Sequence, residues 1–170
     1  MPWTPEKTAG FQQAQIGLET TPGTAVAATV RLMGLQILPK PTIETRKFTP
    51  RGKIVPTLAV VGKDYTTARI EGQPTYQEIG YVLKGCLSNE ANPIIKGDSK
   101  TTAIQTYTVE SGESTAQDMR FAMGTITGFR IRWNSDEVSI EGDIIGQATD
   151  FASRTSGLTD VDVQPIQPDD

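Results

Sequence analysis

The stretch that decides the fold runs from Phe129 to Ile144 and reads FRIRWNSDEVSIEGDI. Apolar residues alternate with charged or polar ones on both sides of the central NSDE, whose residue types favour a turn. A single register satisfies both faces, with these opposed pairs: Trp133 with Val138, Ile131 with Ile140, Arg130 with Glu141, and Phe129 with Gly142. The stretch therefore predicts an antiparallel β-hairpin with one apolar side.

Strand patterns continue on the N-terminal side of this hairpin. They predict short strands over residues 12–18, 30–38, 65–72, 103–110 and 119–123. Pro39 and Pro41 predict a bend after the second of these strands. One helix of about 75–87 is expected, because Thr75 and Glu78 form a capping box behind Pro74 and apolar residues follow at helical spacing. The expected fold is mainly β, a β-sandwich or barrel-like domain with one flanking helix.

Residues 48–64 form the most unusual segment, because glycines and lysines flank an apolar centre. A buried strand is one interpretation, but Pro56 cannot donate a hydrogen bond to a central ladder. A long protruding loop or hairpin, whose apolar tip a partner buries, is the alternative. The organisation expected is an N-terminal arm over 1–10, a β domain over 11–150 that includes this loop, and an acidic C-terminal tail or linker over 151–170.

Charge is distributed unevenly along the chain. Residues 31–84 hold nine basic and four acidic residues, whereas residues 134–170 hold nine acidic residues and one basic residue, Arg154. This asymmetry fits either a solvated acidic tail or a contact between the basic half of one subunit and the acidic half of the next. The net charge of −4 argues against general nucleic-acid binding.

The composition gives little support to enzymatic chemistry. The chain has no histidine and one cysteine, Cys86, so the commonest general base, the Cys–His pair and cysteine zinc clusters are excluded. Phosphate-binding loops and nucleophile elbows are absent. Glu141 and Asp143 share a strand face and could bind a hard cation, but an ion pair between Glu141 and Arg130 is favoured. We expect no catalytic residue, metal or cofactor.

The cellular location is limited by what the sequence lacks. No apolar run reaches the length needed to span a bilayer, and the first residues do not have the layout of a signal peptide. The protein is therefore expected to be made and kept in a cytoplasm until assembly.

Three stretches carry recognisable patterns. Residues 15–29 contain G-x-E-x-T-P-G-T followed by small residues, residues 65–86 run from a strand into a capped helix, and residues 107–146 include T-x-x-G-F-x-I-x-W followed by V-x-I-x-G-D-I-I-G-Q. In these stretches the chain resembles the tail tube (major tail) proteins of long-tailed bacteriophages of the siphophage type. None of these patterns is catalytic. The resemblance covers about residues 15–147.

The resemblance implies a virion tail subunit assembled in the host cytoplasm. Subunits of this type form hexameric rings that stack into a hollow tube, which the tape-measure protein occupies before genome DNA passes through. The tail terminator and the baseplate or distal tail proteins are the other implied partners. In the family a long loop reaches the neighbouring ring, and residues 48–64 stand at the position of that loop.

Charge and hydrophobicity suggest how neighbouring rings meet. The basic residues Arg51, Lys53 and Lys63 are expected to face the acidic Asp136 and Glu137, or the acidic tail, across rings. Removal of apolar side chains from water would supply most of the binding energy. The apolar contact residues expected on the loop are Ile54, Val55, Leu58, Val60 and Val61.

Two other classes remain open at the level of sequence. One is a different tube-like component of a phage or secretion system, such as a tail terminator or a secreted tube protein. The other is a β-sandwich ligand-binding module, which needs exposed aromatic residues in a groove. The candidate aromatics for such a groove are Trp3, Tyr65 and Tyr81.

Overall fold

The computed structural model describes residues 13–87, 104–112, 118–160 and 164–167, so the expected N-terminal arm over 1–10 lies outside the described residues. The fold is mainly β, as expected. The elements are β1 (Gln13–Leu18), β2 (Val30–Leu32), β3 (Leu35–Phe48), β4 (Leu58–Gly72), α1 (Tyr76–Cys86), β5 (Tyr107–Gly112), β6 (Asp118–Trp133), β7 (Val138–Gly146) and β8 (Asp150–Ala152). The strands form one antiparallel sheet of order β2-β1-β5-β6-β7-β4-β3, with β8 also paired to β6.

The long strand β6 joins two layers of this sheet. Its first part pairs with β5 and β8, and its second part pairs with β7. The two layers face each other, and Ser111 on β5 donates a hydrogen bond to the Ile37 carbonyl on β3 at 2.6 Å. Apolar side chains from both layers fill the space between them, including Ile16, Val109 and Phe121 from one layer and Ile70 and Ile140 from the other.

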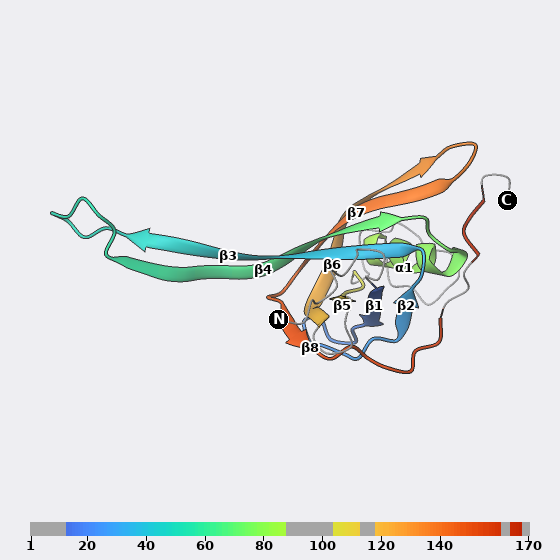
Figure 1. Cartoon of the computed structure of the whole chain (residues 1–170), viewed down its shortest axis with the longest axis horizontal. Coiled ribbons are helices and arrows are strands. Elements are labelled where there is room, and N and C mark those ends of the chain that lie inside the picture. Colours follow the sequence, from blue (N-terminus) through green and yellow to red (C-terminus); the bar gives the residue numbers. More distant parts are fainter. Residues whose placement is uncertain (1–12, 88–103, 113–117, 161–163, 168–170) are drawn as a thin grey trace, which may run out of the picture.

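Helix α1 closes one end of the core (Figure 1). The predicted capping box is present, with the Thr75 hydroxyl and the Glu78 carboxylate both bonded to backbone N–H groups, and the helix ends at Leu87 as expected. Val82 is buried, and Tyr107 donates a hydrogen bond to the Tyr81 carbonyl at 2.7 Å. Tyr76 is the first of the apolar residues predicted at helical spacing, and its exposure makes that predicted stripe only partly correct.

The strand predicted over residues 30–38 is broken into β2 and β3 by a turn at Met33 and Gly34. The Glu78 carboxylate accepts hydrogen bonds from the backbone N–H groups of Met33, at 2.5 Å, and Gly34, at 3.0 Å. A Cβ at Gly34 would lie 2.0 Å from the Gln73 carbonyl oxygen, so only glycine fits this turn. The break depends on a helix 44 residues away, which local periodicity does not reveal.

The bend predicted at Pro39 and Pro41 is wrong, because β3 continues through both prolines to Phe48. The strand tolerates them because it pairs only with β4 among the described strands. Residues two apart direct their N–H groups to the same side of a strand, so both prolines lack a donor on one side only. That side can be the free edge of β3, where no neighbouring strand needs a hydrogen bond. They also reduce the capacity of this edge to pair with another chain.

The outer face of the β1–β5–β6 layer is polar and yet buried. Gln15, Thr108, Glu110 and Asp118 are all at most 2% exposed. Residues 153–155 lie on this face: Arg154 forms an ion pair with Asp118 at 2.5 Å, and Thr155 donates two hydrogen bonds to Glu110. This part of the expected C-terminal tail or linker over 151–170 is therefore bound to the β domain.

Candidate assembly surfaces

The most prominent surface is a β-ribbon that projects far beyond the body of the molecule (Figure 1). Strand β4 pairs with β7 from Thr66 to Gly72. The part of β4 that precedes Thr66 pairs only with β3 among the described strands. We call residues 43–64 the arm, because Ile43 and Asp64 are directly opposed at its base. The arm corresponds to the protruding hairpin that was one of the two interpretations of residues 48–64, and a buried strand is excluded.

The arm carries a large amount of apolar surface in contact with solvent. Ile54 is 100% exposed, and every one of the arm's other large apolar side chains is at least half exposed: Ile43, Phe48, Val55, Leu58, Val60 and Val61. A two-stranded ribbon is at most marginally stable in water by itself. Contiguous exposed apolar surface of this kind marks an interaction site.

The two faces of the arm differ in composition. The register pairs Phe48 with Leu58 and Arg46 with Val60, so one face presents Phe48, Leu58 and Val60 next to one another. Val61 follows Val60 directly, so strand alternation places it on the opposite face, beside Thr45. The larger apolar surface therefore lies on the face that carries Phe48.

The tip of the arm is a defined turn. The Lys53 N–H donates a hydrogen bond to the Pro50 carbonyl at 3.2 Å, and Gly52 has a φ of 84°, which a type II turn requires at its third residue. The Thr57 N–H donates to the Phe48 carbonyl at 3.1 Å and closes the tip. This turn presents Lys53 and the fully exposed Ile54 side by side.

The arm is basic and the rest of the chain is acidic. Residues 43–64 hold five basic residues and two acidic ones, a balance of +3, which leaves −7 for the remainder of a chain whose total is −4. The predicted basic contacts Arg51, Lys53 and Lys63 are all exposed on the arm. Two arms therefore repel each other, whereas an arm is attracted to the body of another copy.

The predicted acidic contacts Asp136 and Glu137 lie in the β6–β7 turn, which is exposed and points away from the arm along the long axis (Figure 1). The structure therefore does not bring the basic and acidic residues together within one chain. Gln73 donates a hydrogen bond to Glu137, which ties this turn to the segment before α1. Trp133, at the end of β6, is 60% exposed.

The same hairpin confirms the predicted register and corrects one predicted ion pair. Trp133 opposes Val138, Ile131 opposes Ile140, and Phe129 opposes Gly142. Arg130 also opposes Glu141, but the ion pairs of Glu141 are with Arg132, at 3.2 Å, and with Arg69, at 3.9 Å. Among the described residues no three acidic or cysteine side chains cluster as metal ligands would.

The glutamate of the pattern G-x-E-x-T-P-G-T is Glu19, and it has a buried structural role that the sequence did not predict. Glu19 is 6% exposed and accepts four hydrogen bonds of 2.8–2.9 Å. The donors are the Gly23 and Met123 N–H groups and the Thr106 and Thr108 hydroxyls. A carboxylate with a full set of donors is stable when buried, and here it fixes the loop before β2 to β5 and β6.

Comparison with known proteins leaves the family open. No protein-family model matches the chain, and the search of curated proteins finds no relative.

Proposed function

We propose that the protein is the structural subunit of a bacteriophage tail tube, whose copies form rings that stack into a conduit for genome DNA. The observation that carries this proposal is the arm, an apolar and basic β-ribbon that pairs with no further strand of the described part of the chain. It projects from an acidic body, as a contact between successive copies requires. The resemblance of the sequence patterns to those of tail tube proteins is the reason for proposing this class of protein.

The arm and the β6–β7 turn lie at opposite ends of the molecule (Figure 1). A contact between unlike surfaces at opposite ends repeats without closing, and it therefore generates a filament or a stack. Rings stacked in this way form a tube. The net charge of −4 suits a wall along which DNA slides, because a strongly cationic wall would bind phosphates tightly.

The energetics favour assembly through many arms at once. Burying a large aliphatic side chain contributes about 1.5–3 kcal/mol, so burial of half of the arm's apolar residues gives roughly 5–10 kcal/mol. Association of two molecules costs about 4–15 kcal/mol in lost freedom and ordering. One arm thus makes a weak contact, whereas several arms between two rings act together and make a strong one.

The test compares the whole protein with a variant whose arm is shortened. Ile43 and Asp64 are directly opposed, so residues 44–63 are replaced with Asn-Gly, which closes a two-residue hairpin. The whole protein is expected to form rings or tubes in negative-stain electron microscopy as its concentration rises. The variant is expected to keep its circular dichroism spectrum and to lose stacking.

Two outcomes count against the proposal. Normal tubes from the shortened variant would show that the arm is not the stacking contact. A whole protein that remains monomeric at every concentration tested, by analytical ultracentrifugation, would overturn the tail tube assignment and favour a β-sandwich ligand-binding module.

A further inference from the structure

We propose that the arm tip of one copy docks in a shallow depression at the far end of the next copy, with Ile54 in the depression and Lys53 beside the β6–β7 turn. This inference rests on the proposed function and names the receptor for the arm. The depression, which we call the far-end depression, is lined by Met33, Gly34, Gln73, Thr75 and Pro165.

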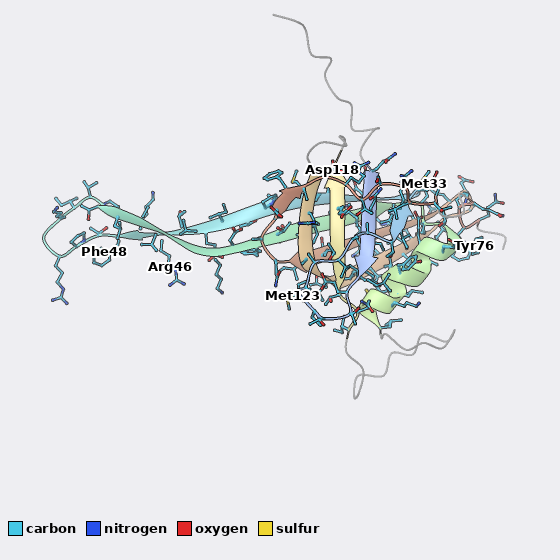
Figure 2. All side chains as sticks on the ribbon, turned by 90° about the horizontal axis from the view of Figure 1, so that it is seen from below. Met33, Arg46, Phe48, Tyr76, Asp118 and Met123 are labelled. Atoms are coloured by element: carbon cyan, nitrogen blue, oxygen red, sulfur yellow. The ribbon has the colours of Figure 1, made fainter. Side chains whose placement is uncertain are left out.

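The position of the far-end depression suits a head-to-tail contact. Met33 lies at the end of the body opposite Arg46 and Phe48 on the arm (Figure 2). The β6–β7 turn, which points to the same end, is tied to the depression because Gln73 donates a hydrogen bond to Glu137. A copy displaced along the long axis therefore brings its arm tip to this surface.

The chemistry of the two surfaces is complementary. Met33 is 45% exposed, and Pro165 is also exposed, so the depression offers apolar surface to an incoming Ile54 that is 100% exposed. Glu137 accepts a hydrogen bond from Gln73, which lines the depression, and Glu137 and its neighbour Asp136 are both exposed. Both carboxylates would face the ammonium group of Lys53. Such a contact combines apolar burial at its centre with opposite charges at its rim.

The walls of the far-end depression are rigid. Hydrogen bonds from the Met33, Gly34 and Thr75 N–H groups converge on the fully buried Glu78 carboxylate. The Ile166 N–H donates to the Pro74 carbonyl at 3.1 Å, which holds the segment that carries Pro165. A preformed receptor binds at a lower entropic cost than one that must be ordered.

The first experiment changes Met33, an exposed residue that lines the depression. Met33→Glu places a charge where Ile54 would bind, and we expect it to raise the critical concentration for stacking at least 10-fold. Met123→Glu is the matched control, because Met123 is 44% exposed on another part of the body (Figure 2), and it is expected to assemble as the unmodified protein does. Circular dichroism confirms that each variant is folded.

A charge exchange keeps the proposal testable even if Met33→Glu fails to fold. Lys53→Glu and Asp136→Lys are each expected to weaken stacking, and the double variant is expected to restore most of it. Restoration is specific to a direct contact between the two sites. The proposed docking would be overturned if both single variants stacked normally, or if both were weakened and the double variant stacked no better than either.

A mixing experiment separates this inference from the proposed function. The shortened-arm variant has only the receptor, and Met33→Glu has only a working arm, so their mixture should form complexes with a single junction that do not grow. If the shortened arm abolishes stacking but Met33→Glu and Asp136→Lys do not, the arm docks elsewhere and only this inference falls. If the unmodified protein never self-associates, both proposals fall.

Discussion

Glu19 and Met123, which are 104 residues apart in sequence, are joined by a hydrogen bond of 2.8 Å from the Met123 N–H to the Glu19 carboxylate. Met123 has a φ of 57°, a left-handed conformation that a residue with a side chain rarely adopts. The carboxylate thus anchors β6 at an irregular point next to Gly124, near the register shift between β5 and β6. Its other three donors come from the loop before β2 and from the start of β5.

Replacing Glu19 with glutamine should strongly destabilise the fold. Each carboxylate oxygen accepts one hydrogen bond from a backbone N–H group and one from a threonine hydroxyl. A hydroxyl can turn to accept a hydrogen bond, but the NH₂ group of glutamine would face one backbone N–H donor in either orientation. Loss of that hydrogen bond to a buried charge costs about 1.5–3 kcal/mol. Urea denaturation measures this loss. The exposed Glu44→Gln on the arm is the control, with an expected change within about 0.5 kcal/mol, and equal effects for the two variants would contradict the assigned role.

Two glycines of α1 should respond to alanine in opposite directions. A Cβ at Gly80 meets nothing within 4 Å, so Gly80→Ala should stabilise the protein by about 0.5–1 kcal/mol through helix propensity. A Cβ at Gly85 would lie 2.7 Å from Ile126 and 2.9 Å from Tyr107, and the overpacking should cost about 1–3 kcal/mol. Thermal unfolding of the two variants gives the comparison, and stabilisation by Gly85→Ala would show that α1 does not pack against β6 this closely.

The thiol of Cys86 should be unreactive in the folded protein. Burial raises its pKa from 9.0 to about 11, so the nucleophilic thiolate is scarce at pH 8. A thiol reagent should modify Cys86 slowly in buffer and rapidly in urea. Because the folded state holds its proton more tightly, the stability from this site is complete below pH 9 and is lost as the pH rises toward 11. Fast modification without denaturant would contradict the raised pKa of the half-buried thiol.

The features that could be predicted from sequence are those with local causes. The register of the β6–β7 hairpin follows from alternation on both sides of one turn, and the capping box follows from residues three apart. The break at Met33 and Gly34 could not be predicted, because a carboxylate on α1 produces it. The continuation of β3 through Pro39 also has a non-local cause, because it depends on the position of β3 at the edge of the described sheet.

The candidate site was predicted in part for the same reason. Residues 48–64 are unusual in the sequence itself, because apolar residues stand between basic ones, and all of the predicted contacts on this segment are exposed. The far-end depression was not foreseen, because it brings together the β2–β3 turn, the segment before α1 and Pro165. Only the fold places these segments next to one another.

Arg154 should be the residue that contributes most to holding the segment after β8 against the β1–β5–β6 layer. It forms an ion pair with Asp118, which is 1% exposed, and it donates to the Gly112 carbonyl and, at 2.7 Å, to the Gln13 side chain. Arg154→Ala removes the guanidinium from the buried Asp118 carboxylate and should cost about 3 kcal/mol. Hydrogen exchange should rise in residues 153–160 before it rises in β5. Arg154→Lys should recover little, since one ammonium cannot reproduce the planar guanidinium contacts, and unchanged exchange in Arg154→Ala would refute the role.

The two faces of the arm should contribute unequally to stacking. Val60 lies on the face with Phe48 and Leu58, whereas its neighbour Val61 lies on the opposite face with Thr45. Both valines are at least half exposed, so serine at either position should leave the stability of the subunit nearly unchanged. Val60→Ser should raise the critical concentration about 10-fold, because it removes roughly 1.5 kcal/mol of apolar burial from the contact. Val61→Ser should change it less than about 3-fold. Light scattering over a concentration series measures both values, and a larger effect of Val61→Ser would show that the arm presents its other face to the neighbouring copy.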